Sequence, residues 1–211
     1  MFYPIFLELK NRRVLVVGGG PVAERKVDSL LEAGARITVV SPDATGHLTE
    51  LAASGRLTLH LRRFEPFDMD GVSLTISATD DPPTQAEVAA IAASKNILVN
   101  TVDKPELCDF IVPSILRRGE ITIAISTSGK SPALAAELRK RFDGVLTDSM
   151  ARTASVMGAI RHEVHDRFSD SEKRKRIFEM IIDSGIVEWI SECDDTAALK
   201  RVRQMIDGFS E

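Results

Sequence analysis

The sequence predicts an α/β protein in which a parallel sheet occupies the first half of the chain and helices occupy the end. Three observations support this class. Short apolar runs rich in Val and Ile alternate with helical patterns as far as about residue 113, a run of glycines follows the first of them, and no strand pattern recurs after Val145. Alternation of strands and helices is typical of a parallel, doubly wound sheet.

The first predicted unit is a βαβ unit over residues 14–40. Residues 14–17 form a continuous apolar run, as expected of a strand buried on both faces of a sheet. A helix is predicted over residues 22–33, ended by Gly34 in a left-handed conformation, and a second strand over residues 37–40. The unit has the length expected for this motif.

The alternation then continues along the chain. Helices are predicted at residues 44–54 and 84–93, and strands at residues 57–59, 72–76 and 97–99. Together with the first unit, these elements predict a Rossmann-type parallel sheet domain.

The pattern changes after Pro113. Residues 120–126 alternate with period two, which predicts a strand with one polar face, and a helix is predicted over residues 133–142. The remainder reads as helical, with a break near residues 183–185. We therefore expect three parts, namely a nucleotide-binding domain at 1–113, a strand-helix segment at 114–144 and a helical C-terminal domain at 145–211.

Composition excludes several classes of function. A net charge of −4 and 5% aromatic residues argue against nucleic acid or an anionic membrane surface as a partner. Cys108 and Cys193 lie far apart and form no CxxC pair, which favours a reducing cytoplasm. The apolar N-terminus lacks the basic region of a signal peptide, and no apolar run approaches the ~20 residues of a membrane span.

The run Gly18-Gly19-Gly20-Pro21-Val22-Ala23 fits the pattern G-x-G-x-x-A between a strand and a helix. In this pattern the first glycine permits a tight turn and the second lets the backbone approach a pyrophosphate. Exposed amides and the positive end of the helix dipole then face the phosphates. The motif predicts dinucleotide binding; the alternative is a tight turn that binds no ligand.

The end of the second strand carries the prediction of which dinucleotide is bound. Ser41 ends this strand and Asp43 follows two residues later, near the position whose carboxylate usually accepts from a ribose hydroxyl. No arginine follows the strand to neutralise a 2′-phosphate, so NAD is favoured over NADP. The alternative is that Asp43 merely caps the next helix.

Two further turns carry candidate substrate-binding residues. Asp103 follows a predicted strand, where open α/β sheets place ligand-contacting residues. The alternative is that Asp103 is a solvated aspartate in a turn. Residues 128–131, Ser-Gly-Lys-Ser, resemble a P-loop, but Ala124 stands where that motif needs glycine. What remains is a hydroxyl-rich turn able to bind an anion, or an ordinary helix cap.

No metal site is expected. His162 and His165 are spaced one residue short of the H-E-x-x-H zinc motif, and no third ligand is in view.

Taken together, these stretches resemble the precorrin-2 dehydrogenase family, whose members are often also sirohydrochlorin ferrochelatases. The family is the free-standing form of the N-terminal part of siroheme synthase. The resemblance is dense as far as about Arg141 and weak in the helical tail. Its specificity comes from the order of four runs, G-G-G-x-V-A-x-R-K, A-T-D-D, N-x-V-D and S-G-x-S-P, which begin at Gly18, Ala78, Asn100 and Ser128.

The resemblance implies NAD-dependent oxidation of precorrin-2 to sirohydrochlorin in a homodimer built through the middle segment and the tail. It leaves open whether Fe²⁺ is inserted in a second step, and no methyltransferase part is expected because none follows in this sequence. It implies Asp103 as the catalytic residue. Cofactor contacts are expected at Gly18, Gly20, Pro21, Val22, Ser41, Pro42, Asp43 and Thr79, and substrate contacts at Asn100, Ser128, Gly129, Lys130 and Ser131.

Two other functions compete with this one. An NAD-sensing regulatory module would explain the glycine turn but not the turns at Asp103 and Ser128. A dehydrogenase acting on another small molecule is the second alternative.

Overall fold

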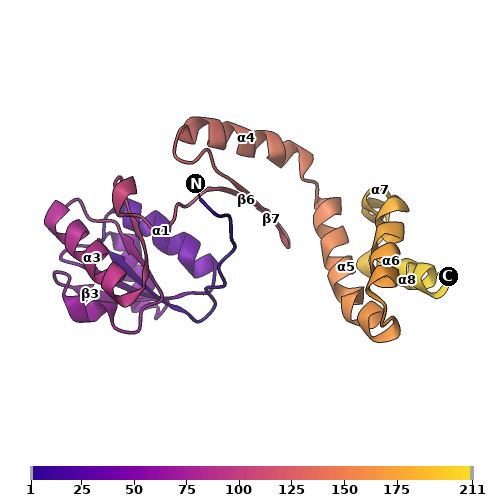
Figure 1. Cartoon of the computed structure of the whole chain (residues 1–211), viewed down its shortest axis with the longest axis horizontal. Helices are drawn as coiled ribbons and strands as arrows, with labels where there is room; N and C mark the ends of the chain where they lie inside the picture. The colour runs from indigo at the N-terminus through magenta and orange to yellow at the C-terminus, as the bar shows by residue number, and fades with distance from the viewer. Residues whose placement is uncertain (1, 210–211) are drawn as a thin grey trace. The chain divides into compact units, whose positions relative to one another are not determined.

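The computed structural model describes residues 2–209 (Figure 1). The chain divides after Val112 into two compact units. The first unit holds the parallel sheet and the second holds a strand pair followed by helices.

The sheet of the first unit has five parallel strands in the order β3-β2-β1-β4-β5, which confirms the predicted Rossmann-type sheet. The strands are β1 (Arg13–Val17), β2 (Arg36–Ser41), β3 (Thr58–Leu61), β4 (Leu74–Ser77) and β5 (Leu98–Thr101). The chain moves outward from β1 through β2 to β3 and then crosses to β4 on the other side of β1. This reversal creates a crevice at the carboxyl ends of β1 and β4, where such sheets bind ligands.

Three helices cross between these strands. They are α1 (Pro21–Glu32), α2 (Gly46–Ala53) and α3 (Pro82–Lys95), and two short 3-10 helices, η1 (Pro66–Met69) and η2 (Pro105–Leu107), lie in the connecting loops. Gly34 follows α1 with φ +73°, as its position in the sequence predicts. Because the strands are parallel, each helix returns the chain from the carboxyl end of one strand toward the start of the next.

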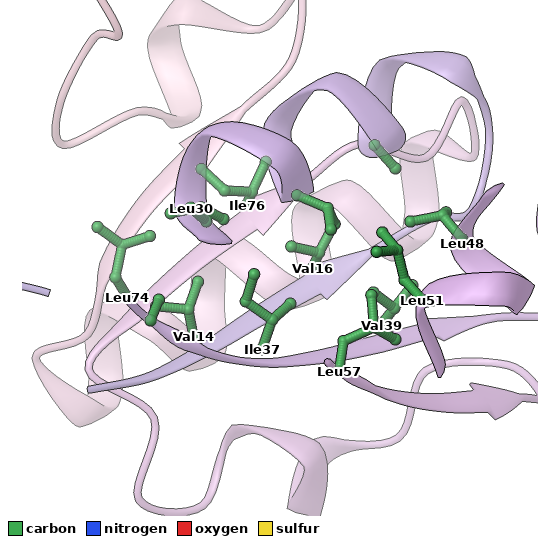
Figure 2. Packing of buried hydrophobic residues seen from close by; sticks show 13 residues of the cluster. Val14, Val16, Leu30, Ile37, Val39, Leu48, Leu51, Leu57, Leu74 and Ile76 are labelled. Carbon is green, nitrogen blue, oxygen red and sulfur yellow. The ribbon is translucent and has the colours of Figure 1, made fainter. Parts of the chain in front are cut away.

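Alternate residues of β1 enter two separate cores. Val14 and Val16 pack with Leu30 and Leu48 in the core that α1 and α2 cover (Figure 2). Leu15, by contrast, belongs to the core on the face of α3. Burial on both faces explains why this strand is apolar at residues 14–17.

The second unit begins with two antiparallel strands, β6 (Ser114–Arg118) and β7 (Ile121–Ile125). The sequence predicted only the second of these strands. The first was missed because Arg117 and Arg118 obscure its pattern and its pairing with β7 decides its conformation. The helix α4 (Pro132–Val145) follows and contacts β6.

The tail folds into a helical cluster, as predicted. It contains α5 (Asp148–Arg167), α6 (Ser171–Asp183), α7 (Ile186–Trp189), η3 (Ile190–Glu192) and α8 (Asp195–Asp207) around a buried core of Ile, Val and Ala side chains. The predicted break near Gly185 separates α6 from α7. None of the helices among residues 2–209 is long and apolar enough to cross a membrane.

Candidate functional site

A cleft of about 470 Å³ opens at the carboxyl ends of the central strands of the sheet. It contains the glycine turn, the end of β2, the loop after β3 and the loop after β4. All eight residues predicted to bind the cofactor line it. The lining residues are Val17, Gly18, Gly19, Gly20, Pro21, Val22, Val40, Ser41, Pro42, Asp43, Arg63, Phe64, Ala78, Thr79, Asp80, Asp81 and Thr84.

The three glycines of the turn have different steric surroundings. At Gly18, where φ is +116°, an added Cβ would lie 2.4 Å from the carbonyl oxygen of Ala78. At Gly19 it would lie 2.1 Å from the carbonyl oxygen of Asp43. A Cβ at Gly20 would meet no protein atom within 4 Å. The first two glycines therefore let the turn pack against neighbouring loops, whereas Gly20 leaves open space in the cleft.

The N-terminus of α1 has no side-chain cap, because its N-cap residue is Gly20. Among the described helices of eight or more residues, the others each have a side-chain oxygen that accepts a hydrogen bond from a first-turn amide, namely α2, α3, α4, α5, α6 and α8. Pro21 at the first helical position has no N–H to satisfy. The next amides of α1 and its dipole are therefore available to an anion in the cleft.

The end of β2 forms a second wall of the cleft. Ser41 is buried and Asp43 is exposed. Asp43 does not cap the following helix, because Thr45 is the N-cap of α2 and its hydroxyl accepts a hydrogen bond from the Leu48 amide at 3.3 Å. The alternative interpretation of Asp43 as a helix cap is therefore wrong, and Asp43 lines the cleft without that structural role.

The loop after β4 is fixed by its own hydrogen bonds. The Thr79 hydroxyl accepts from the Asp81 amide at 3.2 Å, and the Thr79 carbonyl accepts from Gln85 Nε2 at 2.7 Å. Asp81 caps α3 and accepts from the Thr84 amide and hydroxyl, hydrogen bonds that lower the pKa of this carboxyl. This wall is therefore preformed.

Arg63 and Phe64 line the cleft from a segment in which the sequence predicted no site residue. They follow β3, which pairs with β2 in parallel. In the sequence an arginine able to bind a 2′-phosphate is expected after the second strand, and none stands there. The pairing register, which aligns Ser41 with Leu61, is the signal that would have found Arg63.

Asp103 lies in the loop that follows β5 and is exposed. Its backbone is left-handed, with φ +59°, a conformation that Asp and Asn tolerate better than most residues. Asp103 does not line the cleft of about 470 Å³. Because Thr101 at the end of β5 is aligned with Ser77 at the end of β4, Asp103 follows the strand next to the one whose loop lines the cleft.

The loop that carries Asp103 is tied back to β5. The Asn100 side-chain amide donates to the Phe110 carbonyl at 2.9 Å, and the Val99 amide donates to the Asp109 carboxylate at 3.0 Å. Cys108 Sγ lies 3.1 Å from both the amide and the carbonyl oxygen of Thr101. Burial raises the pKa of the Cys108 thiol, which keeps it protonated and able to donate. Asn100 therefore anchors the loop in this structure.

The turn at residues 127–131 joins β7 to α4 and satisfies most of its own amides. The Ser126 hydroxyl accepts from the Ser128 amide, and the Thr127 hydroxyl accepts from the Ser131 amide, both at 3.0 Å. Ser131 Oγ accepts from the Leu134 amide at 3.2 Å and caps α4. Ser128 and Gly129 are left-handed, with φ +55° and +79°.

Lys130 is the charged residue of this turn. Its side chain is exposed, and no residue of the described range 2–209 forms an ion pair with it. The ammonium group of Lys130 can therefore bind an anion.

Within the described range 2–209, no three His, Cys, Asp or Glu side chains gather as they would around a metal ion.

Three family models match consecutive parts of the chain. Residues 5–114 match a putative NAD(P)-binding domain. Residues 118–143 match the central region of a sirohaem biosynthesis protein, and residues 149–206 match a sirohaem synthase dimerisation region. The first model covers the cleft described above, so the chain carries an NAD(P)-binding domain.

Individual relatives agree with the family models. A siroheme synthase from Methylobacillus flagellatus is 40% identical over 99% of this chain and 44% of its own length. One from Thioalkalivibrio sulfidiphilus is 39% identical over 98% of this chain and 42% of its own length. The chain thus spans less than half of these relatives. A solved structure, SirC, precorrin-2 dehydrogenase, superposes with a TM-score of 0.78 at 26% identity, covering 96% of this chain and 100% of that one.

Proposed function

The chain belongs to the family of sirohaem biosynthesis proteins that carry an NAD(P)-binding domain, and we propose that it oxidises precorrin-2 to sirohydrochlorin with NAD. The observation that carries the proposal is the start of α1, which has no side-chain cap and lines a cleft together with the glycine turn. The rest of the chain matches regions of sirohaem biosynthesis proteins. The similarity to SirC, precorrin-2 dehydrogenase, which covers nearly the whole chain, supports the same activity.

We propose that the cleft holds the dinucleotide through backbone and side-chain groups. Gly18 lets the turn pack against the loop after β4, and Gly20 leaves room for the pyrophosphate. The first-turn amides of α1 beside Pro21 and Val22 would donate to the pyrophosphate. Asp43, with Ser41 and Pro42, would accept from the adenosine ribose hydroxyls, and Thr79 would line the opposite wall. When bound, the nicotinamide supplies the hydride acceptor.

The proposed reaction removes two hydrogens from precorrin-2. One leaves as hydride to give NADH, and the other leaves as a proton that a base must accept. We propose Asp103 as this base, because its carboxylate is exposed on a loop that β5 holds in place. Asn100, which fixes that loop, would act by positioning it.

We further propose that the turn after β7 binds substrate carboxylates. Precorrin-2 carries many carboxylates, and the exposed Lys130 ammonium is available to pair with one of them. The hydroxyls of Ser128 and Ser131 can donate as well, and Gly129 gives the turn its left-handed bend. This binding would depend mainly on side chains, since the amides of Ser128 and Ser131 already donate within the turn.

The division of labour along the chain is also a proposal. We assign NAD binding to residues 1–113, substrate contact and dimer formation to 114–144, and a helical dimerisation domain to 145–211. The match of residues 149–206 to a dimerisation region supports a homodimer. The two cysteines are free, which fits the proposed cytoplasmic location. Insertion of Fe²⁺ stays a prediction of the resemblance.

The test is to mix the purified chain with precorrin-2 and NAD and to follow absorbance for sirohydrochlorin and NADH. We expect both products from the unaltered chain. Asp103→Asn, which keeps the shape and tolerates the left-handed backbone, should lower kcat by about 100-fold or more with NAD affinity unchanged. Glu106→Gln, an exposed carboxylate in the same loop, is the matched control.

The outcomes separate the competing functions. NAD binding without turnover would favour an NAD-sensing module, and unchanged turnover in Asp103→Asn would remove Asp103 from the mechanism. Adding Fe²⁺ after the first reaction tests the second activity by the spectrum of siroheme.

A further inference from the structure

Arg63 and Asp43 line the same cleft from the loops that follow two paired parallel strands. Ser41 at the end of β2 pairs with Leu61 at the end of β3. Asp43 and Arg63 each lie two residues beyond this aligned pair, and both line the cleft. The cleft thus holds both a carboxylate and a guanidinium, the two groups by which Rossmann-type domains distinguish the 2′-hydroxyl of NAD from the 2′-phosphate of NADP.

The neighbouring arginine fixes the backbone of this loop. Arg62 donates to both oxygens of Asp68, at 2.8 and 2.6 Å, and to the carbonyl oxygen of Arg63 at 3.0 Å. The Asp68 side chain is only 4% exposed, and the Arg62 guanidinium also lies 5.0 Å from the centre of the Phe67 ring. Arg62 is therefore occupied within the loop, whereas Arg63 is exposed at the cleft.

The Arg63 guanidinium is available to a ligand. No residue within the described range 2–209 forms a hydrogen bond or ion pair with its side chain. The pKa of Asp81 is lowered mainly by hydrogen bonds from Thr84 and further by the positive charge of Arg63, so this charge acts within the cleft. The other charged lining residues, Asp43, Asp80 and Asp81, are all acidic.

We propose that Arg63 is a specificity-determining residue that binds the 2′-phosphate of NADP, so that the cleft accepts NADP as well as NAD. A guanidinium pairs with phosphate through two parallel hydrogen bonds, and a nearby arginine is how such domains accommodate the 2′-phosphate. Asp43 serves the free ribose hydroxyls of NAD, and Arg63 offsets its repulsion of the phosphate. This inference rests on the proposed function only in requiring a dinucleotide in the cleft.

The test is calorimetric titration of the full chain and of Arg63→Gln with NAD and with NADP. We expect the unaltered chain to bind both. Arg63→Gln should weaken NADP binding about tenfold or more, as expected for loss of a charge-assisted pair, and leave the NAD affinity within about twofold. Arg56→Gln, an exposed arginine of the same unit outside the cleft, is the control and should change neither affinity.

Three results would overturn the inference while leaving the proposed function intact. They are NAD binding without NADP binding by the unaltered chain, an NADP affinity unaffected by Arg63→Gln, and an equal loss for both dinucleotides, which would place Arg63 on their shared part. Failure of the unaltered chain to bind either dinucleotide would instead overturn the proposed function and the inference together.

Discussion

Two turns of this chain have nearly the same design but different chemistry. Both follow a strand, contain a glycine with positive φ and lead into a helix with Pro at its first position, Pro21 in α1 and Pro132 in α4. In the first turn the N-cap is Gly20, which offers no side-chain oxygen. In the second it is Ser131, whose hydroxyl accepts from the helix, and two further hydroxyls accept from the turn.

The difference shows that the ligand a helix start can bind depends on what already occupies its amides. At α1 the amides are left for a pyrophosphate, so recognition uses the backbone and is insensitive to most side chains. At α4 the amides of Ser131 and Leu134 already donate to side-chain hydroxyls, so we expect recognition to use the side chains of Ser128 and Lys130. An added side chain should therefore weaken NAD binding at the first turn, whereas removal of a side chain should weaken substrate binding at the second turn.

The largest effect is expected at Gly20. Gly20→Ala adds one carbon in open space, so the fold should persist, but the Cβ would occupy the path of the pyrophosphate. NAD affinity should fall roughly 30-fold or more, about 2 kcal/mol, as measured by calorimetry. Gly46→Ala, where an added Cβ is equally free, is the control. Equal NAD affinity in the two variants would contradict backbone recognition at α1.

A smaller effect is expected from the side chain of the second turn. Lys130→Gln removes the ammonium and should raise the KM for precorrin-2 by about tenfold, with NAD affinity unchanged. Lys200→Gln, an exposed lysine of α8, is the control and should leave KM unchanged. If Lys130→Gln behaved like that control, the second turn would be a helix cap and no more.

The third prediction concerns the cap itself. Ser131→Ala removes the acceptor for the Leu134 amide and should lower the free energy of unfolding of the second unit by about 1 kcal/mol. Denaturant unfolding followed at Trp189 fluorescence measures it, because Trp189 packs in that unit. NAD affinity should not change. A stability unaffected by Ser131→Ala would mean that water replaces this hydroxyl without loss.

The smallest effect is expected on the pH dependence of helix stability, which should differ between a helix capped by a carboxylate and one capped by a hydroxyl. Asp81 caps α3, and hydrogen bonds from Thr84 lower its pKa. A lowered pKa means that the cap contributes stability above the unfolded-state pKa and loses it as pH falls through the folded-state value. Hydrogen-exchange protection at the start of α3 should therefore fall in acid, whereas protection at Leu134, capped by a hydroxyl, should not follow that titration.

The glycine turn was predictable from sequence because its requirements are local. A strand, a tight turn and a helix lie within one short stretch, and the position of each glycine follows from sterics. The same holds for Gly34 and for the period-two strand β7. The eight expected cofactor residues therefore lie around one cleft; their contact with NAD stays a prediction.

Features that depend on pairing between distant strands were not predictable in the same way. Arg63 reaches the cleft only because β3 pairs with β2 in a given register, and β6 is a strand only because β7 pairs with it. Nor does the sequence reveal that Thr45 rather than Asp43 caps α2, since both residue types favour that position.

The central claim is that the uncapped amides at the start of α1 hold the pyrophosphate. Titrating NAD into the ¹⁵N-labelled chain and following amide resonances tests it directly, because each amide reports its own hydrogen bond. The account predicts large shifts at Val22 and Ala23 and none at Leu134, whose amide already donates to Ser131. Saturable NAD binding that leaves Val22 and Ala23 unshifted would contradict it.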